Sequence, residues 1–126
     1  MKSAIRILLL ICFCVPAGLY AQASLTGDWQ MSVPTEDGGT MKIYVSFGAG
    51  NTYSVDLGGD GTVDITGKYE LKDNQVSIKD NGGSEACTGT GVYKVESSEK
   101  TLKMTRVSDS CEGRGGPTGI MQFTRR

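Results

Sequence analysis

Apolar and polar residues alternate one by one through most of this chain, and this period of two limits what it can fold into. The run at 40–47 places an apolar side chain at every second position, and the runs at 52–57 and 63–71 repeat the pattern. Strands that bury one face and expose the other have this pattern. No stretch shows the stripe of about 3.6-residue period that an amphipathic helix requires. The chain is predicted to be all-β.

Clusters of Gly, Asn, Asp and Ser interrupt the alternation at seven places and predict turns. Because the links are short, each strand should pair with the next one along the chain. Eight strands in this order favour an antiparallel up-and-down barrel, since closure removes both free edges. An incompletely closed barrel and a two-sheet sandwich are the alternatives. The predicted strands lie near 25–34, 40–47, 51–57, 62–71, 75–80, 87–96, 101–108 and 119–125.

Residues 1–23 have the composition of a signal peptide and are left out of the predicted fold. Two basic residues precede nine consecutive apolar ones, and the small-x-small sequence of a cleavage site follows. An apolar run of this length is too short to span a bilayer core of about 30 Å. We expect cleavage after Ala21 or Ala23, a periplasmic or secreted protein without a membrane span, and a single domain over 24–126.

Composition excludes several classes of function. The chain contains no His, which removes Ser-His-Asp triads, His-ligated metals and imidazole acid–base chemistry. Without residues 1–23, 11 basic residues face 14 acidic ones, so no basic surface for nucleic acid is indicated. We therefore predict a protein that is not an enzyme, with no catalytic residues and no cofactor.

Two cysteines, Cys87 and Cys111, remain after the predicted cleavage. In an oxidising compartment such a pair is expected to form a disulfide. One cysteine begins the predicted strand at 87–96 and the other follows the strand at 101–108, so the two lie near each other in a hairpin. Loop-closure entropy for a ring of this size is worth about 3.5 kcal/mol.

A cluster of acidic residues resembles part of a calcium loop. Asp56, Asp60 and Asp64 have suitable spacing, but Gly67 stands where a loop of this kind needs its closing Glu. An Asp-Gly hairpin turn between two strands explains the same residues. No metal site is predicted.

Several short motifs of the chain occur together in one known family. Gly27 and Trp29 form a Gly-x-Trp at the start of the first strand. Cys87, the Gly-x-Tyr at 91–93, the Asp-x-Cys-x-Gly-Arg at 109–114 and a short aromatic last strand follow. Together they resemble small secreted bacterial lipocalin-like proteins of the calycin superfamily. The resemblance implies that Arg125, or else Arg126, lies across the Trp29 ring at one end of the barrel, beside Gly27.

The apolar positions of the strands, Val63 among them, predict an interior of aliphatic and aromatic side chains. This interior suits a ligand cavity and a filled barrel equally. Strands of about seven residues favour a filled barrel or a small cavity.

Arg106 has the same parity as Leu102 and Met104 of its strand. Facing inward, it would hold the carboxylate of an amphipathic acid together with Tyr93 or Tyr69; the alternative is that it reaches water at the barrel rim. The candidate ligand-binding residues are Arg106, Tyr93, Tyr69, Tyr53 and Met104. The predicted function is that of an exported binding protein for a small apolar or amphipathic ligand. The alternative is a filled barrel that acts as a protein-interaction, inhibitor or envelope scaffold module.

Overall fold

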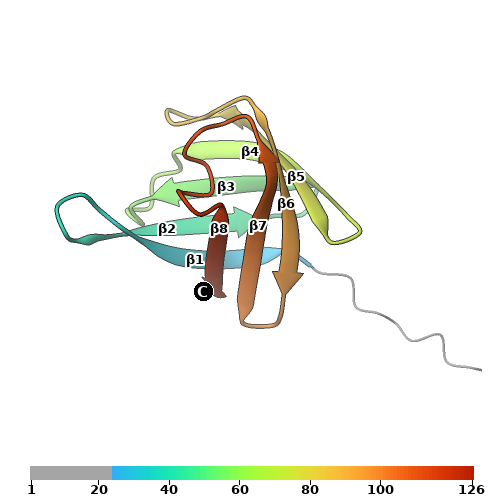
Figure 1. Ribbon diagram of the computed structural model, residues 1–126, viewed down its shortest axis with the longest axis horizontal. Helices are drawn as coiled ribbons and strands as arrows, with labels where there is room; N and C mark the ends of the chain where they lie inside the picture. Colours follow the sequence, from blue (N-terminus) through green and yellow to red (C-terminus); the bar gives the residue numbers. More distant parts are fainter. Residues whose placement is uncertain (1–23) are drawn as a thin grey trace, which may run out of the picture.

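A computed structural model describes residues 24–126, and the predicted signal peptide lies outside the described residues. The chain forms a closed barrel of eight antiparallel strands in sequence order, which confirms the predicted all-β fold (Figure 1). Within residues 24–126, no helix is long and apolar enough to cross a membrane. The strands are β1 (Gly27–Pro34), β2 (Thr40–Phe47), β3 (Thr52–Leu57), β4 (Ile65–Lys72), β5 (Gln75–Gly82), β6 (Thr90–Ser97), β7 (Thr101–Asp109) and β8 (Ile120–Arg125).

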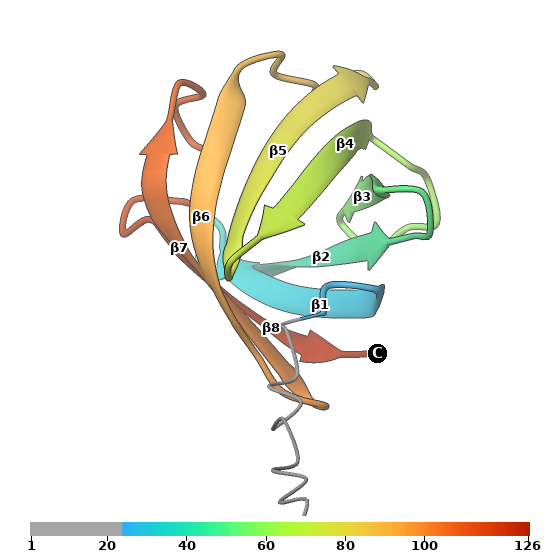
Figure 2. The ribbon, with the colours of Figure 1, turned by 90° about the vertical axis from the view of Figure 1, so that its right-hand side faces the viewer.

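Each strand pairs with the next, and β1 closes the barrel by pairing with β8. Figure 2 shows β1 between β2 and β8, with the other strands fanning around the barrel. Because the strands alternate in direction, the β1–β2, β3–β4, β5–β6 and β7–β8 loops share one end of the barrel. We call this the open end. The start of β1 and the three remaining turns lie at the other end, which we call the sealed end.

The alternating residues face the barrel interior and form one core. Near the sealed end Phe47 packs edge-on against Tyr69, with 5.1 Å between the ring centroids. The buried apolar residues of the strands are Trp29, Val45, Phe47, Tyr53, Tyr69, Val76, Ile78, Tyr93, Val95, Leu102, Met104 and Phe123.

Two strands begin three residues later than the sequence predicts. β4 starts at Ile65 and β6 at Thr90, where strand starts near 62 and 87 were expected. Before β4, the amide of Asp64 donates to the carbonyl of Val55, and the Asp64 carboxylate accepts the amide of Leu57 at 2.8 Å. The loop therefore folds back on β3 before the ladder starts. The predicted inward orientation of Val63 is wrong, since this side chain is 53% exposed.

Trp29 and Arg125 close the sealed end. The Trp29 indole is fully buried and its Nε1 donates to the carbonyl of Leu25 at 2.9 Å. The guanidinium carbon of Arg125 lies 4.2 Å from the centroid of the Trp29 ring, which is the contact that the resemblance implies. Gly27, at φ 131°, permits it, because a Cβ there would collide with the Arg125 guanidinium. Arg126 instead lies over the Tyr44 ring.

Candidate binding cavity

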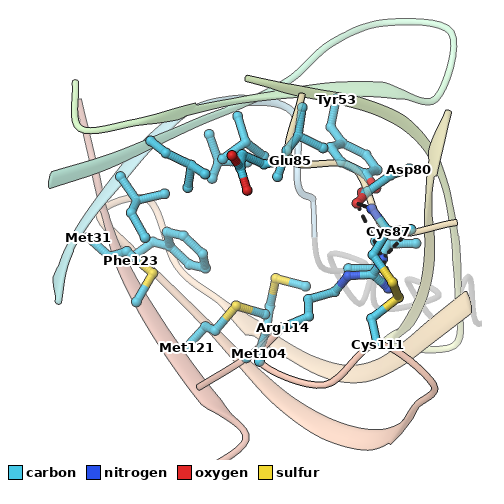
Figure 3. Close-up of a pocket in the computed structure, with 18 of the residues that line it drawn as sticks. Met31, Tyr53, Asp80, Glu85, Cys87, Met104, Cys111, Arg114, Met121 and Phe123 are labelled. Carbon is cyan, nitrogen blue, oxygen red and sulfur yellow. Dashed lines mark hydrogen bonds and ion pairs between the residues drawn. A yellow bond between two sulfur atoms is a disulfide. The ribbon is translucent and has the colours of Figure 1, made fainter. Parts of the chain in front are cut away.

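A cavity of about 340 Å³ occupies the barrel interior toward the open end (Figure 3). This volume lies at the lower end of the range for ligand pockets, about 300–1,000 Å³, so the cavity is small, as the strand lengths suggest. Most of its wall consists of apolar side chains from seven of the eight strands. They are Met31, Ile43, Val45, Phe47, Val55, Leu57, Ile65, Ile78, Met104, Met121 and Phe123.

The polar part of the wall comes from β3, β5 and two loops of the open end. Tyr53 and Asp80 project from the strands, Glu85 from the β5–β6 loop, and Glu112 and Arg114 from the β7–β8 loop. Glu85, Glu112 and Arg114 lie at the mouth of the cavity, because their loops belong to the open end. In Figure 3, Tyr53, Asp80 and Arg114 lie together on one side of the cavity, and Glu85 lies apart from them. A molecule inside would therefore meet an apolar interior and a polar entrance.

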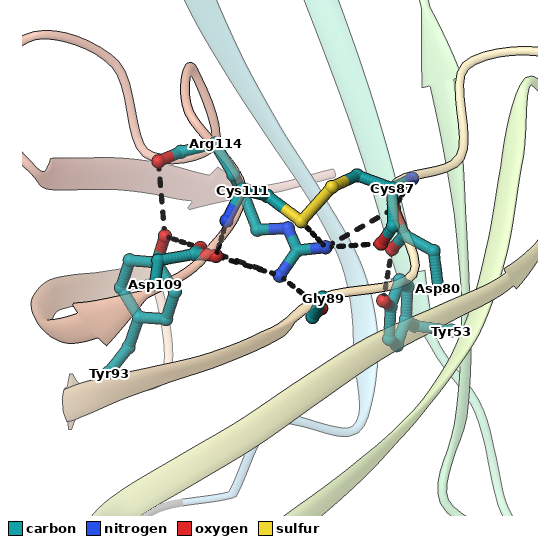
Figure 4. The surroundings of a disulfide bond; sticks show 8 residues. All are labelled: Tyr53, Asp80, Cys87, Gly89, Tyr93, Asp109, Cys111 and Arg114. Atoms are coloured by element: carbon teal, nitrogen blue, oxygen red, sulfur yellow. Dashed lines mark hydrogen bonds and ion pairs between the residues drawn. A yellow bond between two sulfur atoms is a disulfide. The ribbon is translucent and has the colours of Figure 1, made fainter.

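Arg114 is the centre of this polar region (Figure 4). Its Nη2 lies 3.4 Å from Oδ2 of Asp80, and its Nη1 lies 3.2 Å from Oδ1 of Asp109. The same nitrogens donate to the carbonyls of Cys87 at 2.8 Å and Gly89 at 3.1 Å. One guanidinium thus joins β5, the β5–β6 loop and the end of β7.

Each of the two carboxylates beside Arg114 accepts hydrogen bonds from a tyrosine hydroxyl and from the backbone amide of a cysteine. Asp80 accepts the Tyr53 hydroxyl and, at 2.8 Å, the amide of Cys87. Asp109 accepts the Tyr93 hydroxyl at 2.6 Å and the amide of Cys111 at 2.8 Å. The polar region therefore contains two Tyr–Asp–Cys units that share one arginine.

The disulfide joins these two units. Cys87 and Cys111 are bonded, with 6.2 Å between their Cα atoms, which confirms the predicted pairing. Gly91 keeps room for the network, since a Cβ there would lie 2.6 Å from Oδ2 of Asp109 and 2.9 Å from Nη1 of Arg114. The disulfide and the arginine together hold the β7–β8 loop against the β5–β6 loop.

Both tyrosines of these units keep their hydroxyl protons at neutral pH. Burial, and next the hydrogen bond to Asp109, raise the pKa of Tyr93 to about 12. Burial, and next the hydrogen bond to Asp80, raise the pKa of Tyr53. Each hydroxyl is therefore a fixed donor to a carboxylate.

The structure brings only some of the predicted ligand-binding residues to the cavity. Tyr53 and Met104 line it, whereas Tyr69, Tyr93 and Arg106 are not among the lining residues. The Tyr69 hydroxyl donates to the carbonyl of Gly48 at 3.3 Å, toward the sealed end, and Tyr93 binds Asp109.

Arg106 braces the β7–β8 loop. Its Nη2 donates to the carbonyls of Arg114 and Gly116, at 2.5 and 3.0 Å. The Tyr93 hydroxyl approaches the same Arg114 carbonyl at 3.2 Å. Arg106 and Tyr93 therefore meet at a backbone carbonyl of the loop, whereas the sequence predicted that they hold the carboxylate of a ligand.

Sequence reasoning missed Asp80, Glu85, Glu112 and Arg114 as cavity residues. Glu112 and Arg114 belong to the Asp-x-Cys-x-Gly-Arg motif, and that motif was the available signal. Asp80 and Glu85 had none, because only the fold brings Asp80 to Arg114 and Glu85 to the cavity wall.

The three acidic residues that resemble part of a calcium loop form a turn, in which their carboxylates accept hydrogen bonds from backbone amides. Oxygens of Asp56, Asp60 and Asp64 lie within 4.8 Å of one another. They accept the amides of Gly61 at 2.8 Å, Thr62 at 2.9 Å and Leu57 at 2.8 Å, in that order. Amide donors thus occupy these carboxylates, as in the hairpin turn that the sequence favours.

A closed eight-stranded barrel with one sealed end and an apolar cavity behind a polar mouth defines a class of cup-shaped binding barrels. The sequence model of the lipocalin-like domain matches residues 25–104, and the chain belongs to this family. Proteins of this family are generally binding proteins. The Asp109–Arg114 segment follows the matched region. No match was found among curated proteins or among solved structures.

Proposed function

We propose that the protein is an exported carrier that binds one small apolar or amphipathic molecule and does not catalyse a reaction. The observation that carries the proposal is the apolar cavity, reached at the open end of a barrel that Trp29 and Arg125 seal at the other. Burial of a ligand's apolar surface in such a cavity supplies the binding free energy.

Export is supported by two features. The first 23 residues have the sequence of a signal peptide, and the fold is cross-linked by a disulfide. Disulfides of this structural kind form and persist in the periplasm and outside the cell.

Titration of residues 24–126 with the neutral apolar dye N-phenyl-1-naphthylamine tests the binding function. We expect saturable binding at one site. Met121→Trp replaces a flexible thioether of the cavity wall with a bulky indole ring and should abolish binding. Val107→Trp is the control, because Val107 is 57% exposed on the outer face of β7. Circular dichroism checks that both variants are folded.

Binding that is absent, or equally strong in both variants, would contradict the carrier function. It would favour a protein-interaction role, for which Val107 and the 44% exposed Ile120 on the neighbouring strand β8 offer exposed apolar side chains.

A further inference from the structure

The loops around the cavity mouth are strongly acidic. The four open-end loops, which span 35–39, 58–64, 83–89 and 110–119, contain six acidic residues and one basic residue, Arg114. None of them contains Lys. The acidic residues are Glu36, Asp37, Asp60, Asp64, Glu85 and Glu112. A mouth lined by one sign of charge concentrates ions of the opposite sign.

The single basic residue is already neutralised. Arg114 lies between two carboxylates, those of Asp80 and Asp109, and its side chain is only 13% exposed. Both of its terminal nitrogens also bind backbone carbonyls. One arginine between two carboxylates leaves an excess of negative charge, so this group offers no site for an anion.

Two acidic side chains of the cavity wall are available to a ligand. Glu85 and Glu112 line the cavity and are exposed. Within residues 24–126, neither carboxylate has a hydrogen bond or an ion pair. In Figure 3 the Glu85 carboxylate lies at the edge of the open middle of the cavity. A cation entering the mouth would meet these carboxylates first.

The interior suits the remainder of such a molecule. The aromatic rings of Phe47, Tyr53 and Phe123 line the cavity, as do the thioethers of Met31, Met104 and Met121. Aromatic faces attract cations, and methionine side chains adapt to apolar groups of varied shape. An apolar group joined to a cationic head is therefore complementary to the whole cavity.

We infer that the ligand is a hydrophobic cation, which rests on the proposed carrier function. Its apolar part enters the barrel and its positively charged head stays at the mouth, beside Glu85 and Glu112. A molecule with a carboxylate head is disfavoured by the same charges. Arg106 does not change this, because its Nη2 binds loop carbonyls and its side chain is not part of the cavity wall.

Three probes with the same apolar chain test the inference. Decyltrimethylammonium, decanol and undecanoate, each with a ten-carbon alkyl chain on its head group, are used to displace the neutral dye at low ionic strength. We expect affinity to fall in that order, with at least about a tenfold difference between the cation and the anion, or 1.4 kcal/mol. Added salt should narrow the difference, since it screens charges at an exposed mouth.

Two double variants test whether the acidic residues at the mouth cause the preference for the cationic probe over the anionic one. Glu85→Gln with Glu112→Gln should reduce the advantage of the cation over the anion to below about threefold, with decanol as the neutral reference, because the charges alone are removed. Glu70→Gln with Glu96→Gln is the matched control. It removes the same charge from exposed residues of β4 and β6 outside the cavity wall, and should retain the preference.

The outcomes separate the two proposals. If decanol displaces the dye but the cation binds no better than undecanoate, the ligand class is wrong and the carrier function stands. An equal loss of preference in both double variants also overturns the assignment to the mouth. If the folded protein binds neither the dye nor any of the three probes, the carrier function itself fails.

Discussion

Arg114 connects β5, the β5–β6 loop and the end of β7 through two nitrogen atoms. Its partners Asp80 and Asp109 have side chains that are 6% and 0% exposed. Charges buried to this degree are tolerated only when they are paired and hydrogen-bonded. The arginine therefore supplies the counter-charge for both buried carboxylates.

Replacing this arginine should destabilise the fold strongly. Arg114→Met leaves two buried carboxylates without a counter-charge, and we expect the free energy of unfolding to fall by about 3–5 kcal/mol. Arg126→Met is the control, since Arg126 is exposed and lies over a single ring. Its loss should cost about 1 kcal/mol or less. Urea denaturation measures both, and equal losses would contradict the role assigned to Arg114.

Tyr93 should make stability depend on pH in the alkaline range. The pKa of this hydroxyl rises to about 12 on folding, so between its unfolded value of about 10 and 12 the unfolded state loses the proton first. The stabilising contribution is complete below pH of about 10 and is lost as pH rises toward 12.

The matched variant isolates this group. Tyr93→Phe cannot ionise, so its free energy of unfolding should fall less steeply from about pH 10 to 12 than that of the parent protein. Urea denaturation at each pH measures the two slopes. Parallel curves would show that Tyr93 does not carry the dependence.

The contact of Arg125 with Trp29 could be predicted from the sequence, whereas the contacts of Arg114 could not. The Gly-x-Trp motif pointed to Trp29 and Arg125, because a known family places an arginine there. Arg114 was part of a quoted motif, but its partners Asp80 and Cys87 lie 34 and 27 residues away. Alternation along a strand carries no information on such distant pairs.

The two loops of the disulfide depend on each other. The β7–β8 loop is held by Arg106 and Arg114 as well as by Cys111, and the β5–β6 loop contributes Cys87 and the Gly89 carbonyl. Both loops supply residues to the cavity wall. Their relative position therefore sets the shape of the mouth.

Removing the disulfide should lower stability without removing the barrel. Cys87→Ser with Cys111→Ser releases a ring whose ends are 24 residues apart. Loop-closure entropy predicts a loss of about 3.5 kcal/mol, which corresponds to a Tm about 10 °C lower or more. Thermal unfolding followed by far-ultraviolet circular dichroism measures the change. A Tm that matches the parent's would contradict the entropic contribution.

The strand pattern was predictable, and the strand starts at β4 and β6 were not. Seven turns and eight runs followed from alternation, because a half-buried strand imposes that pattern directly. The starts moved by three residues where side chains hold the backbone away from the ladder. Asp64 does this before β4, and Cys87, bound to Asp80 and Cys111, precedes the start of β6.

Barrel closure depends on a short seam between the first and last strands. β1 and β8 share only two residue pairs, Trp29 with Arg125 and Gln30 with Thr124, whereas β1 and β2 share eight. Arg125 also donates to the Glu99 carbonyl at 2.7 Å, which links the seam to the β6–β7 turn. The barrel junction with the fewest residue pairs is thus reinforced by a side chain.

Amide hydrogen exchange should identify this seam. We expect its amides to exchange faster than those between β1 and β2, since fewer bonds must break to open it. Arg125→Leu removes the contact with Trp29, worth about 0.5–2 kcal/mol, and should accelerate exchange at the seam while leaving β3–β4 unchanged. Equal protection in the two junctions, or no effect of the variant, would contradict this view of closure.

Trp29, the only tryptophan of the sequence, is fully buried at the sealed end and is not part of the cavity wall. Its fluorescence emission should therefore report whether the sealed end is intact. A ligand that enters the mouth would leave that emission nearly constant, whereas opening of the seam would expose the indole and shift the emission to longer wavelength. The chain thus contains an intrinsic optical reporter of barrel closure that is spatially separate from the proposed binding event.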